Sequence, residues 1–327
     1  ADIKWSDVTP WKLLVADSAA TVIEKSLLFP VDTLRTRMQT DTTEGVSLLR
    51  QLRDVTAATW GEGWSYGRAT HTIYRGPAML RAAIGGLRGG VARMYKGLTF
   101  SVLNQIPSNV VYLFSYQWVK EQIETKLPLG KTHDGSPWPP LLAAIATEVM
   151  CVPFDVPHDV VTQRLQTQPM ASVAPFQRTW KTPVQGLVEL AEIYKAEGLR
   201  GCYGSTRAHL LTYLPWSCAW WMSYEMSRLG LQKLGQPLNI TGAPVQIGAG
   251  VFAGFCAAAV SNPIDVLKTR MQVDPALGRR GIAAVAREVV SREGPQALFK
   301  GLAVALLFDM LVSAGGGYRY DWVMRFA

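Results

Sequence analysis

Six predominantly apolar stretches alternate with polar segments along the chain. Each is 18 to 22 residues long, and they span residues 11–29, 98–119, 138–156, 210–227, 245–262 and 302–322. An α-helix needs about 20 apolar residues to cross the hydrocarbon core of a bilayer. The pattern therefore predicts an all-α membrane protein with six membrane helices, arranged along the chain as three pairs.

A motif of proline, acid and base recurs three times, where the first, third and fifth stretches end. It reads P-x-D-x-x-(K/R)-x-R-x-Q and begins at Pro30, Pro157 and Pro263. The second copy has Thr162 in place of the first basic residue. Three copies of so specific a string indicate an internal repeat, which is the signature of a repeated structural unit.

A second recurring signal separates the two stretches of each pair. It consists of an aromatic residue between two glycines, and it occurs at 90–97, 198–204 and 294–301. Together the two signals predict three tandem two-helix repeats around a pseudo-threefold axis. The repeats are expected at residues 1–128, 129–237 and 238–327.

The repeated motif predicts a ring of charges inside the bundle. A helix turns about 100° per residue, so Asp32 and Arg35 lie on one face, one turn apart. A proline bends or breaks a helix because it removes a hydrogen bond and clashes with the preceding turn. Three bent helices would converge at one end and form interhelical ion pairs. Such pairs can close a pore and reopen, since each contributes only about 1 kcal/mol near water. The alternative is that the prolines and charges only cap helix ends at the membrane surface.

Composition supports a membrane protein with basic loops. Charged residues make up 18% of the chain, against roughly 25% in soluble domains, while hydrophobic residues make up 48%. The formal net charge is +8 and the mean hydropathy is +0.09. The apolar content excludes a disordered chain. Nucleic acid would explain the basic charge but not the apolar content, so positive loops beside a membrane fit better.

No chemistry of an enzyme is evident in the sequence. The four cysteines lack the spacing of metal ligands and are expected to be buried free thiols: Cys151, Cys202, Cys218 and Cys256. We find no nucleophile–base constellation, no nucleotide-binding loop and no metal-ligand cluster. We therefore expect no catalytic activity, no metal and no cofactor.

The threefold motif and the six stretches resemble the mitochondrial carrier family over nearly the whole chain. Residues 198–224, with Tyr213, Pro215 and two adjacent tryptophans, further resemble the branch that includes the branched-chain amino acid carrier. The resemblance implies a multi-pass protein of the mitochondrial inner membrane with both termini toward the intermembrane space. It also implies transport of a small metabolite, such as an amino acid, by alternating access between two salt-bridge gates.

In the family the ring of charges is the matrix gate. Carried over, the gate comprises Asp32, Arg35, Asp159, Thr162, Asp265 and Lys268, braced by Gln39, Gln166 and Gln272. The family pairs each acid with the basic residue of the next odd-numbered helix. This implies ion pairs from Asp159 to Lys268 and from Asp265 to Arg35. The remaining acid, Asp32, faces Thr162 and gains a hydrogen bond at best.

The resemblance also implies a cytoplasmic gate on the even-numbered helices, in which the family pattern is poorly kept. The residues at its positions are Gln117, Lys120, Glu225, Arg228 and Asp321. With the pairing of the family, only Asp321 and Lys120 can form a salt bridge. Arg228 and Gln117 can form a hydrogen bond. Glu225 faces Met324. This gate is expected to be weak. A weak gate indicates either that it opens more easily or that the chain is no longer selected to alternate between its two open states.

Helical arithmetic gives two charged candidates for the central cavity. Lys25 lies seven residues before Asp32, and Glu148 lies eleven before Asp159, each about 20° from the same face. Ionisable side chains at membrane depth usually face water or a partner. The alternatives are a structural ion pair and snorkelling to the surface.

The family implies further solute contacts on the even-numbered helices. At these positions the chain has Asn104, Gln105, Thr212, Tyr213 and Asp309. A nucleotide carrier would need several arginines there to bind phosphates. The set suits a small zwitterion or a cation better, which agrees with an amino acid.

Several departures from the family pattern support a second hypothesis. Small residues favour close helix packing in membranes, and the fifth helix has them at Gly250 and Gly254. The equivalent pairs, Asp17 with Thr21 and Ala144 with Glu148, are less favourable. The first repeat has an enlarged matrix loop with a basic stretch at 61–88, suited to anionic lipid such as cardiolipin or to an acidic partner. The chain could therefore be a carrier-fold structural subunit of a larger inner-membrane complex of respiratory type, rather than a transporter.

Overall fold

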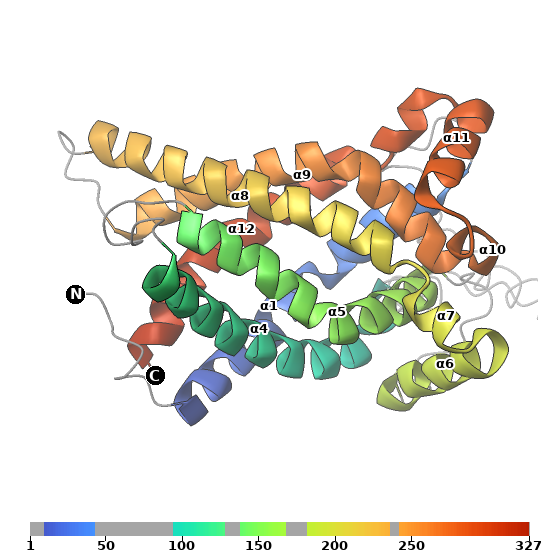
Figure 1. The fold of residues 1–327 in the computed structure, drawn as a ribbon, viewed down its shortest axis with the longest axis horizontal. Coiled ribbons are helices and arrows are strands. Elements are labelled where there is room, and N and C mark those ends of the chain that lie inside the picture. Colours follow the sequence, from blue (N-terminus) through green and yellow to red (C-terminus); the bar gives the residue numbers. More distant parts are fainter. Residues whose placement is uncertain (1–9, 43–93, 128–137, 168–181, 236–241, 327) are drawn as a thin grey trace, which may run out of the picture.

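The computed structural model describes residues 10–42, 94–127, 138–167, 182–235 and 242–326, and these are helical with no strand among them. Six long helices form the body (Figure 1): α1 (Pro10–Thr40), α4 (Leu98–Lys126), α5 (Trp138–Thr167), α8 (Thr206–Gly235), α9 (Ala243–Val273) and α12 (Leu302–Phe326). They coincide with the six predicted stretches, which confirms the predicted fold class. The basic stretch at 61–88 lies outside the described residues.

Shorter helices gather at one end of the long bundle. They are α6 (Thr182–Glu197), α7 (Leu199–Tyr203), α10 (Pro275–Gly278), α11 (Ile282–Glu293) and the 3₁₀ helix η6 (Pro295–Phe299). Figure 1 shows α6, α7, α10 and α11 at the end of the bundle opposite the two chain termini. We call these two ends the short-helix end and the terminal end.

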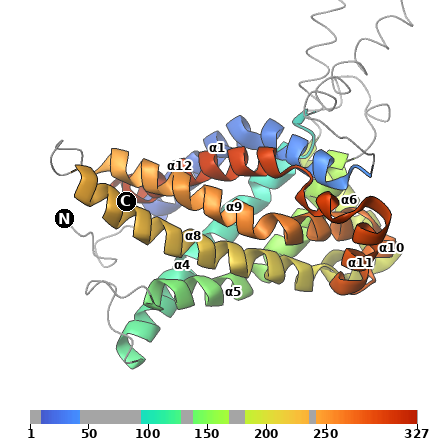
Figure 2. The same ribbon diagram turned by 90° about the horizontal axis from the view of Figure 1, so that it is seen from above.

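The three motif prolines lie inside helices and do not end them. Pro30, Pro157 and Pro263 lie within α1, α5 and α9, and each helix continues through the rest of its motif. The motif acids and bases therefore lie on continuous helices that lead to the short-helix end. The view from above in Figure 2 shows α8, α9 and α12 running along the long axis of the molecule, with α10 and α11 beyond the end of α9.

Two apolar clusters fix the long helices to the short ones. Val156, Val160 and Val161 of α5 pack with Phe100, Leu165, Ile193 and Cys202, which joins α4 and α5 to α6 and α7. Leu267 and Met271 of α9 pack with Ala208, Val285, Val289 and Ala297, which joins α8 and α9 to α11 and η6. Both clusters thus lie beside the motif. All four cysteines are free. Cys151 and Cys202 are buried as expected, but Cys218 and Cys256 are only half-buried, since neighbouring helices cover their faces of α8 and α9 only in part.

The lines of contact between neighbouring helices, which we call seams, differ between the repeats. In α9, a Cβ on Gly250 or Gly254 would overlap the carbonyl oxygen of Ser313 or of Asp309, so α9 and α12 touch through their backbones. In α1 the seam is polar, because the Asn109 amide of α4 donates to Thr21 at 2.9 Å and to Asp17 at 3.3 Å. Hydrogen bonds thus replace close glycine packing in the first repeat.

Three helices meet a strict length and hydropathy criterion for a membrane span, at Leu141–Thr167, Ala243–Val273 and Pro295–Gly315 of the described chain. The helices α1, α4 and α8 are also long enough, with 31, 29 and 30 residues, but carry more polar residues. Their outward faces remain apolar, and exposed side chains there include Ile23, Leu27, Trp118, Met222 and Met226. Six membrane helices whose polar faces point inward explain both the polar residues of α1, α4 and α8 and the apolar side chains on their outer surfaces.

Candidate functional site

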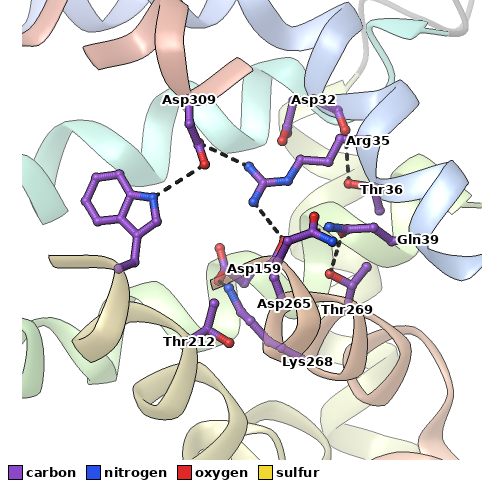
Figure 3. Close-up of polar contacts among 12 residues, drawn as sticks. Asp32, Arg35, Thr36, Gln39, Asp159, Thr212, Asp265, Lys268, Thr269 and Asp309 are labelled. Atoms are coloured by element: carbon purple, nitrogen blue, oxygen red, sulfur yellow. Dashed lines mark hydrogen bonds and ion pairs between the residues drawn. The ribbon is translucent and has the colours of Figure 1, made fainter. Parts of the chain in front are cut away.

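Two interhelical ion pairs occupy the motif ring, which we define as Asp32, Arg35, Asp159, Thr162, Asp265 and Lys268. Lys268 Nζ of α9 lies 2.6 Å from Asp159 Oδ2 of α5. Arg35 Nη2 of α1 lies 2.7 Å from Asp265 Oδ2 of α9. Figure 3 shows both acids and both bases converging between the helices. The ring joins α1, α5 and α9 because each motif continues on an unbroken helix past its proline.

The third link of the motif ring differs from the expectation for Thr162. The Gln166 amide, not Thr162, donates a hydrogen bond to Asp32 Oδ2 at 2.9 Å. The Thr162 hydroxyl is buried and has no hydrogen-bond partner in the described part of the chain. Threonine is too short to reach the neighbouring helix, whereas glutamine one turn later has the length. Asp32 forms no ion pair among the described residues.

Two of the three motif glutamines are integral to the ring. Gln39 Nε2 donates to Asp265 Oδ2 at 2.7 Å, and its Oε1 accepts from the Thr269 hydroxyl at 3.0 Å. Gln166 repeats this arrangement, because its Oε1 accepts from the Thr36 hydroxyl at 2.8 Å.

The third glutamine lacks these contacts. The Gln272 side-chain amide is buried and has no hydrogen-bond partner among the described residues. The residue equivalent to Thr36 and Thr269 is Gln163, whose Oε1 is likewise buried without a partner. The sequence reasoning missed these threonines, although the string R-T-R or K-T-R in two motif copies could have revealed them.

The second arginine of the motif braces one repeat against the next. Arg164 Nε donates to the Gln272 carbonyl at 3.0 Å, and Arg270 Nε donates to the Gln39 carbonyl at 2.9 Å. Each arginine also pairs with the acid before the glycine signal of its own repeat, Glu197 at 2.7 Å for Arg164 and Glu293 for Arg270. The sequence reasoning did not assign these arginines a role, although the pattern R-x-Q with a later E-G recurs in both repeats.

Glu293 is the centre of a compact charge cluster at the short-helix end. Its carboxylate accepts hydrogen bonds from Arg270 and from Lys300 Nζ, the latter at 2.7 Å. Burial alone would raise the pKa of this carboxyl. The hydrogen bonds from the two bases more than offset burial, so the pKa of Glu293 lies below its ordinary value. The cluster therefore stays charged at neutral pH.

Arg35 connects the motif ring to an acid deeper in the bundle. Its Nη1 lies 3.3 Å from Asp309 Oδ1 of α12, while its Nη2 holds Asp265. The Trp216 indole N–H points at the other Asp309 oxygen, at 3.4 Å. Figure 3 shows Asp309 and Asp265 on either side of the guanidinium. Asp309 thus lies among charged and aromatic groups of α1, α8 and α9.

One face of α5 carries two carboxylates that have only hydroxyl partners, the buried Glu148 and the half-buried Asp155. Glu148 accepts a hydrogen bond from the Ser217 hydroxyl of α8 at 3.3 Å, and Asp155 accepts one from the Ser108 hydroxyl of α4. Neither forms an ion pair within the described residues. The sequence reasoning missed Asp155, although residues 148, 155 and 159 share a helix face by their spacing.

Four other predicted solute contacts are more dispersed. Tyr213 lies inside, with its ring centroid 4.4 Å from Lys268 Nζ. Thr212 instead uses its hydroxyl within α8, donating to the Ala208 carbonyl, and Gln105 donates to Asn109 within α4. Asn104 donates to the Phe154 carbonyl, at 3.4 Å. Tyr213 thus lies against a charged group, whereas the side chains of Asn104, Gln105 and Thr212 donate their hydrogen bonds to uncharged groups.

Lys25 is half-buried and makes no hydrogen bond or ion pair with another described residue. Glu148 and Lys25 therefore do not neutralise each other. The place of Lys25 in the cavity stays a prediction, with snorkelling as its alternative.

The predicted cytoplasmic gate lies at the terminal end. There Arg228 Nη2 pairs with Glu225 Oε2 of its own helix at 2.7 Å, and both side chains are about one third exposed. Arg228 thus forms its ion pair within α8, and its expected contact with Gln117 stays a prediction. Lys120 forms no ion pair with a described residue. Asp321 lies near the end of α12, where side chains are outside the described set. The described gate residues thus form no interhelical ion pair, in contrast to the motif ring.

Comparison with known proteins gives a consistent result over three segments. A family model described as "Mitochondrial carrier protein" matches residues 6–127, 133–234 and 241–327. The chain is 26% identical to mouse "Solute carrier family 25 member 44", over 93% of this chain and 87% of the relative. It is 30% identical to "Mitochondrial substrate carrier family protein E" of Dictyostelium discoideum, over 66% of this chain and 72% of the relative. A third relative is "S-adenosylmethionine carrier 1, chloroplastic/mitochondrial" of Arabidopsis thaliana, 24% identical over 90% and 72% of the two chains.

Proposed function

Because the chain belongs to the mitochondrial carrier family, we propose that it moves a small zwitterionic or cationic metabolite, an amino acid in the first instance, by alternating access. Members of this family are multi-pass transporters of small solutes in the mitochondrial inner membrane and are not enzymes. The short-helix end then faces the matrix, and both termini face the intermembrane space.

The observation that carries the choice of solute is the surplus of acid inside the bundle. Glu148 and Asp155 have only hydroxyl partners, and Asp309 shares Arg35 with Asp265. A buried carboxylate without a counter-charge is costly, so a site of this composition favours a ligand that brings a positive charge. A multivalent anion would meet repulsion there.

Arg35 and the aromatic residues of α8 complete a site for a zwitterion. Arg35 can donate hydrogen bonds to a solute carboxylate, while Asp309 or Glu148 binds the ammonium group. Tyr213, Trp216 and Trp220 follow one another at helical spacing, with ring centroids 6.5 Å apart at each step. They offer an apolar surface beside Asp309 for the side chain of the solute. The similarity to a relative named as an S-adenosylmethionine carrier also supports a solute that carries a positive charge.

The shared contacts of Arg35 suggest how solute binding opens the matrix gate. A solute carboxylate that draws Arg35 away from Asp265 removes one of the two ion pairs of the motif ring. An ammonium group on Asp309 leaves Arg35 with a single partner and frees it to move. Because Arg35 exchanges one carboxylate for another, its own buried charge is never left unpaired. Binding of a small solute therefore weakens one of the two ion pairs that hold the gate closed.

A structural subunit of a larger inner-membrane complex is the second candidate. It is favoured by two groups that are buried without a partner in the described chain, Gln163 Oε1 and the Gln272 side-chain amide, and by the Glu225–Arg228 pair inside one helix. Anionic lipid such as cardiolipin would bind its basic matrix side in either case. Native size after gentle detergent extraction separates the candidates, because a free carrier runs near a detergent-bound monomer of 35.9 kDa.

Transport is tested in liposomes that contain the purified chain. Uptake of tritiated leucine or lysine is expected, and labelled citrate and ATP are expected to be excluded. Glu148→Gln should lower uptake about tenfold or more, since a lost charged hydrogen bond costs about 1.5–3 kcal/mol. Lys12→Gln, on the first turn of α1 away from the acids, serves as the matched control and should retain uptake. Faster uptake of citrate or ATP than of either amino acid would overturn the proposal.

A further inference from the structure

Two histidines lie against a single acid of the motif ring. His158 Nδ1 of α5 lies 3.5 Å from Asp159 Oδ1, and His209 Nδ1 of α8 lies 3.3 Å from Asp159 Oδ2. The same Oδ2 atom accepts the ion pair of Lys268. The chain has four histidines, so half of them contact one carboxylate. The other two motif copies have Val31 and Ile264 at the position of His158.

Both histidines are buried, and their other contacts hold them in place. His158 is 7% exposed, and its Nε2 lies 3.1 Å from the Ser101 hydroxyl of α4. His209 is 1% exposed and lies beside the Tyr213 ring, with centroids 4.4 Å apart. The His209 ring nitrogens make no hydrogen bond to another described residue apart from the approach to Asp159. A buried imidazole with one carboxylate contact is best satisfied when it donates to that carboxylate.

Charged groups surround the two histidines. The titratable and charged groups beside them are Asp155 and Asp159 of α5, Tyr213 of α8 and Lys268 of α9. Asp159 is held by Lys268. Asp155 has only the Ser108 hydroxyl as its partner among the described residues. The cluster thus contains one acid more than its bases neutralise.

We propose that His158 and His209 form a proton-binding site on Asp159, and that the matrix gate opens with a proton held there. The inference rests on the transport function proposed above. Opening the ring separates α5 from α9 and removes Lys268 from Asp159. A buried carboxylate that loses its partner is strongly destabilising. His158 precedes Asp159 directly in the chain, so it stays beside the carboxylate when the helices part.

A protonated imidazole therefore replaces Lys268 as the counter-charge of Asp159 in the open state. The proton binds to a ring nitrogen of His158 or His209 from the side to which the bundle is open. It leaves to the matrix after the gate has opened, and Lys268 then returns to Asp159. One proton moves with each solute, and no other bond is made or broken. The carrier is thus a proton–solute symporter.

The proposal is tested in liposomes with pH 6 outside and pH 8 inside, with tritiated leucine and tritiated lysine as probes. The wild type should accumulate its probe above the outside concentration, and a protonophore should abolish the accumulation. The protonated fraction of a free histidine falls about 25-fold between pH 6 and pH 8, which sets the upper limit of the pH effect on uptake. The double variant His158→Gln/His209→Gln should show slow, pH-independent uptake without accumulation. His133→Gln is the control and should behave as the wild type.

A second readout needs no solute. The wild type in detergent should gain thermal stability between pH 8 and pH 6 relative to the double variant, because the protonated imidazoles pair with Asp159. This contribution is present at lower pH and is lost as pH rises. The same comparison shows whether the variants are folded.

The outcomes separate the two proposals. If the wild type takes up neither probe, the proposed function fails, and the thermal comparison still decides the proton site. If the wild type takes up a probe but a pH gradient drives no accumulation, or the double variant accumulates equally well, the proton site is overturned. An equal pH dependence of stability in the wild type and the double variant overturns it as well.

Discussion

Arg35 and Asp309 lie 3.3 Å apart, and the same guanidinium holds Asp265 at 2.7 Å. Asp265 belongs to the motif ring, whereas Asp309 lies deeper in the bundle and also meets the Trp216 indole. One side chain of α1 thus contacts a gate acid of α9 and a candidate solute contact of α12. Whatever binds Asp309 changes the electrostatic environment of the ring.

Replacement of Asp309 by asparagine tests this coupling. The asparagine side chain keeps an oxygen for the Trp216 N–H but loses the charge that attracts Arg35 and a solute ammonium. We expect uptake of the transported amino acid to fall about tenfold or more, because a charged hydrogen bond contributes about 1.5–3 kcal/mol. The measurement is the initial uptake rate in liposomes, with thermal unfolding as a check of the fold.

Trp216→Phe is the matched control for that experiment. It removes the indole N–H but keeps an aromatic surface, so we expect a smaller loss of uptake than for Asp309→Asn. Unchanged uptake in Asp309→Asn would remove Asp309 from the solute path.

The three motif glutamines are expected to differ in their contribution to stability. Gln166→Ala removes hydrogen bonds to Asp32 and Thr36 and should destabilise the fold by about 1–3 kcal/mol, because it leaves buried polar groups unsatisfied. Gln272→Ala should cost clearly less, since its side-chain amide makes no hydrogen bond to a described residue. Unfolding in detergent, followed by intrinsic fluorescence, measures both. Equal losses would show that the two glutamines have equivalent surroundings in the working protein.

The repeated motif allowed much of this architecture to be predicted from sequence. The positions of Asp159, Lys268, Asp265 and Arg35 follow from three copies of one string, because identical spacing on three helices implies equivalent places. Departures within a copy were harder to interpret. The sequence could not show that Gln166 reaches Asp32 where Thr162 does not, because the choice depends on side-chain length across a helix gap.

Contacts that involve residues outside the motif ring were not predicted from the sequence. His209 lies outside every recognised motif, and its approach to Asp159 depends on how α8 packs beside α5. The braces from Arg164 and Arg270 to backbone carbonyls depend on the same tertiary placement. Periodicity fixes the face on which a residue lies but not its partner on another helix.

The ion pair of Lys268 with Asp159 should be strongly destabilised when one partner is removed. Lys268→Ala leaves a carboxylate in a largely buried site, which costs about 3–5 kcal/mol. The double variant Lys268→Ala/Asp159→Asn should recover part of this loss, because no unpaired charge remains. Unfolding of both variants and of Asp159→Asn completes a double-mutant cycle. Additive losses would mean that the pair does not couple α5 to α9.

The Glu293 cluster should make the folded protein less stable as the pH falls into the acid range. Because the folded-state pKa of Glu293 lies below its ordinary value, the carboxylate contributes stability that is present above its unfolded pKa, about 4.3 for a free glutamate. The contribution is lost as pH falls through the folded pKa, since protonation breaks the charged contacts with Arg270 and Lys300. Glu293→Gln should therefore lower the thermal unfolding temperature at pH 6 but have less effect at pH 3. Glu192→Gln, on α6 and away from this cluster, is the control and should shift neither value; an equal shift for Glu293→Gln at both pH values would contradict the assignment.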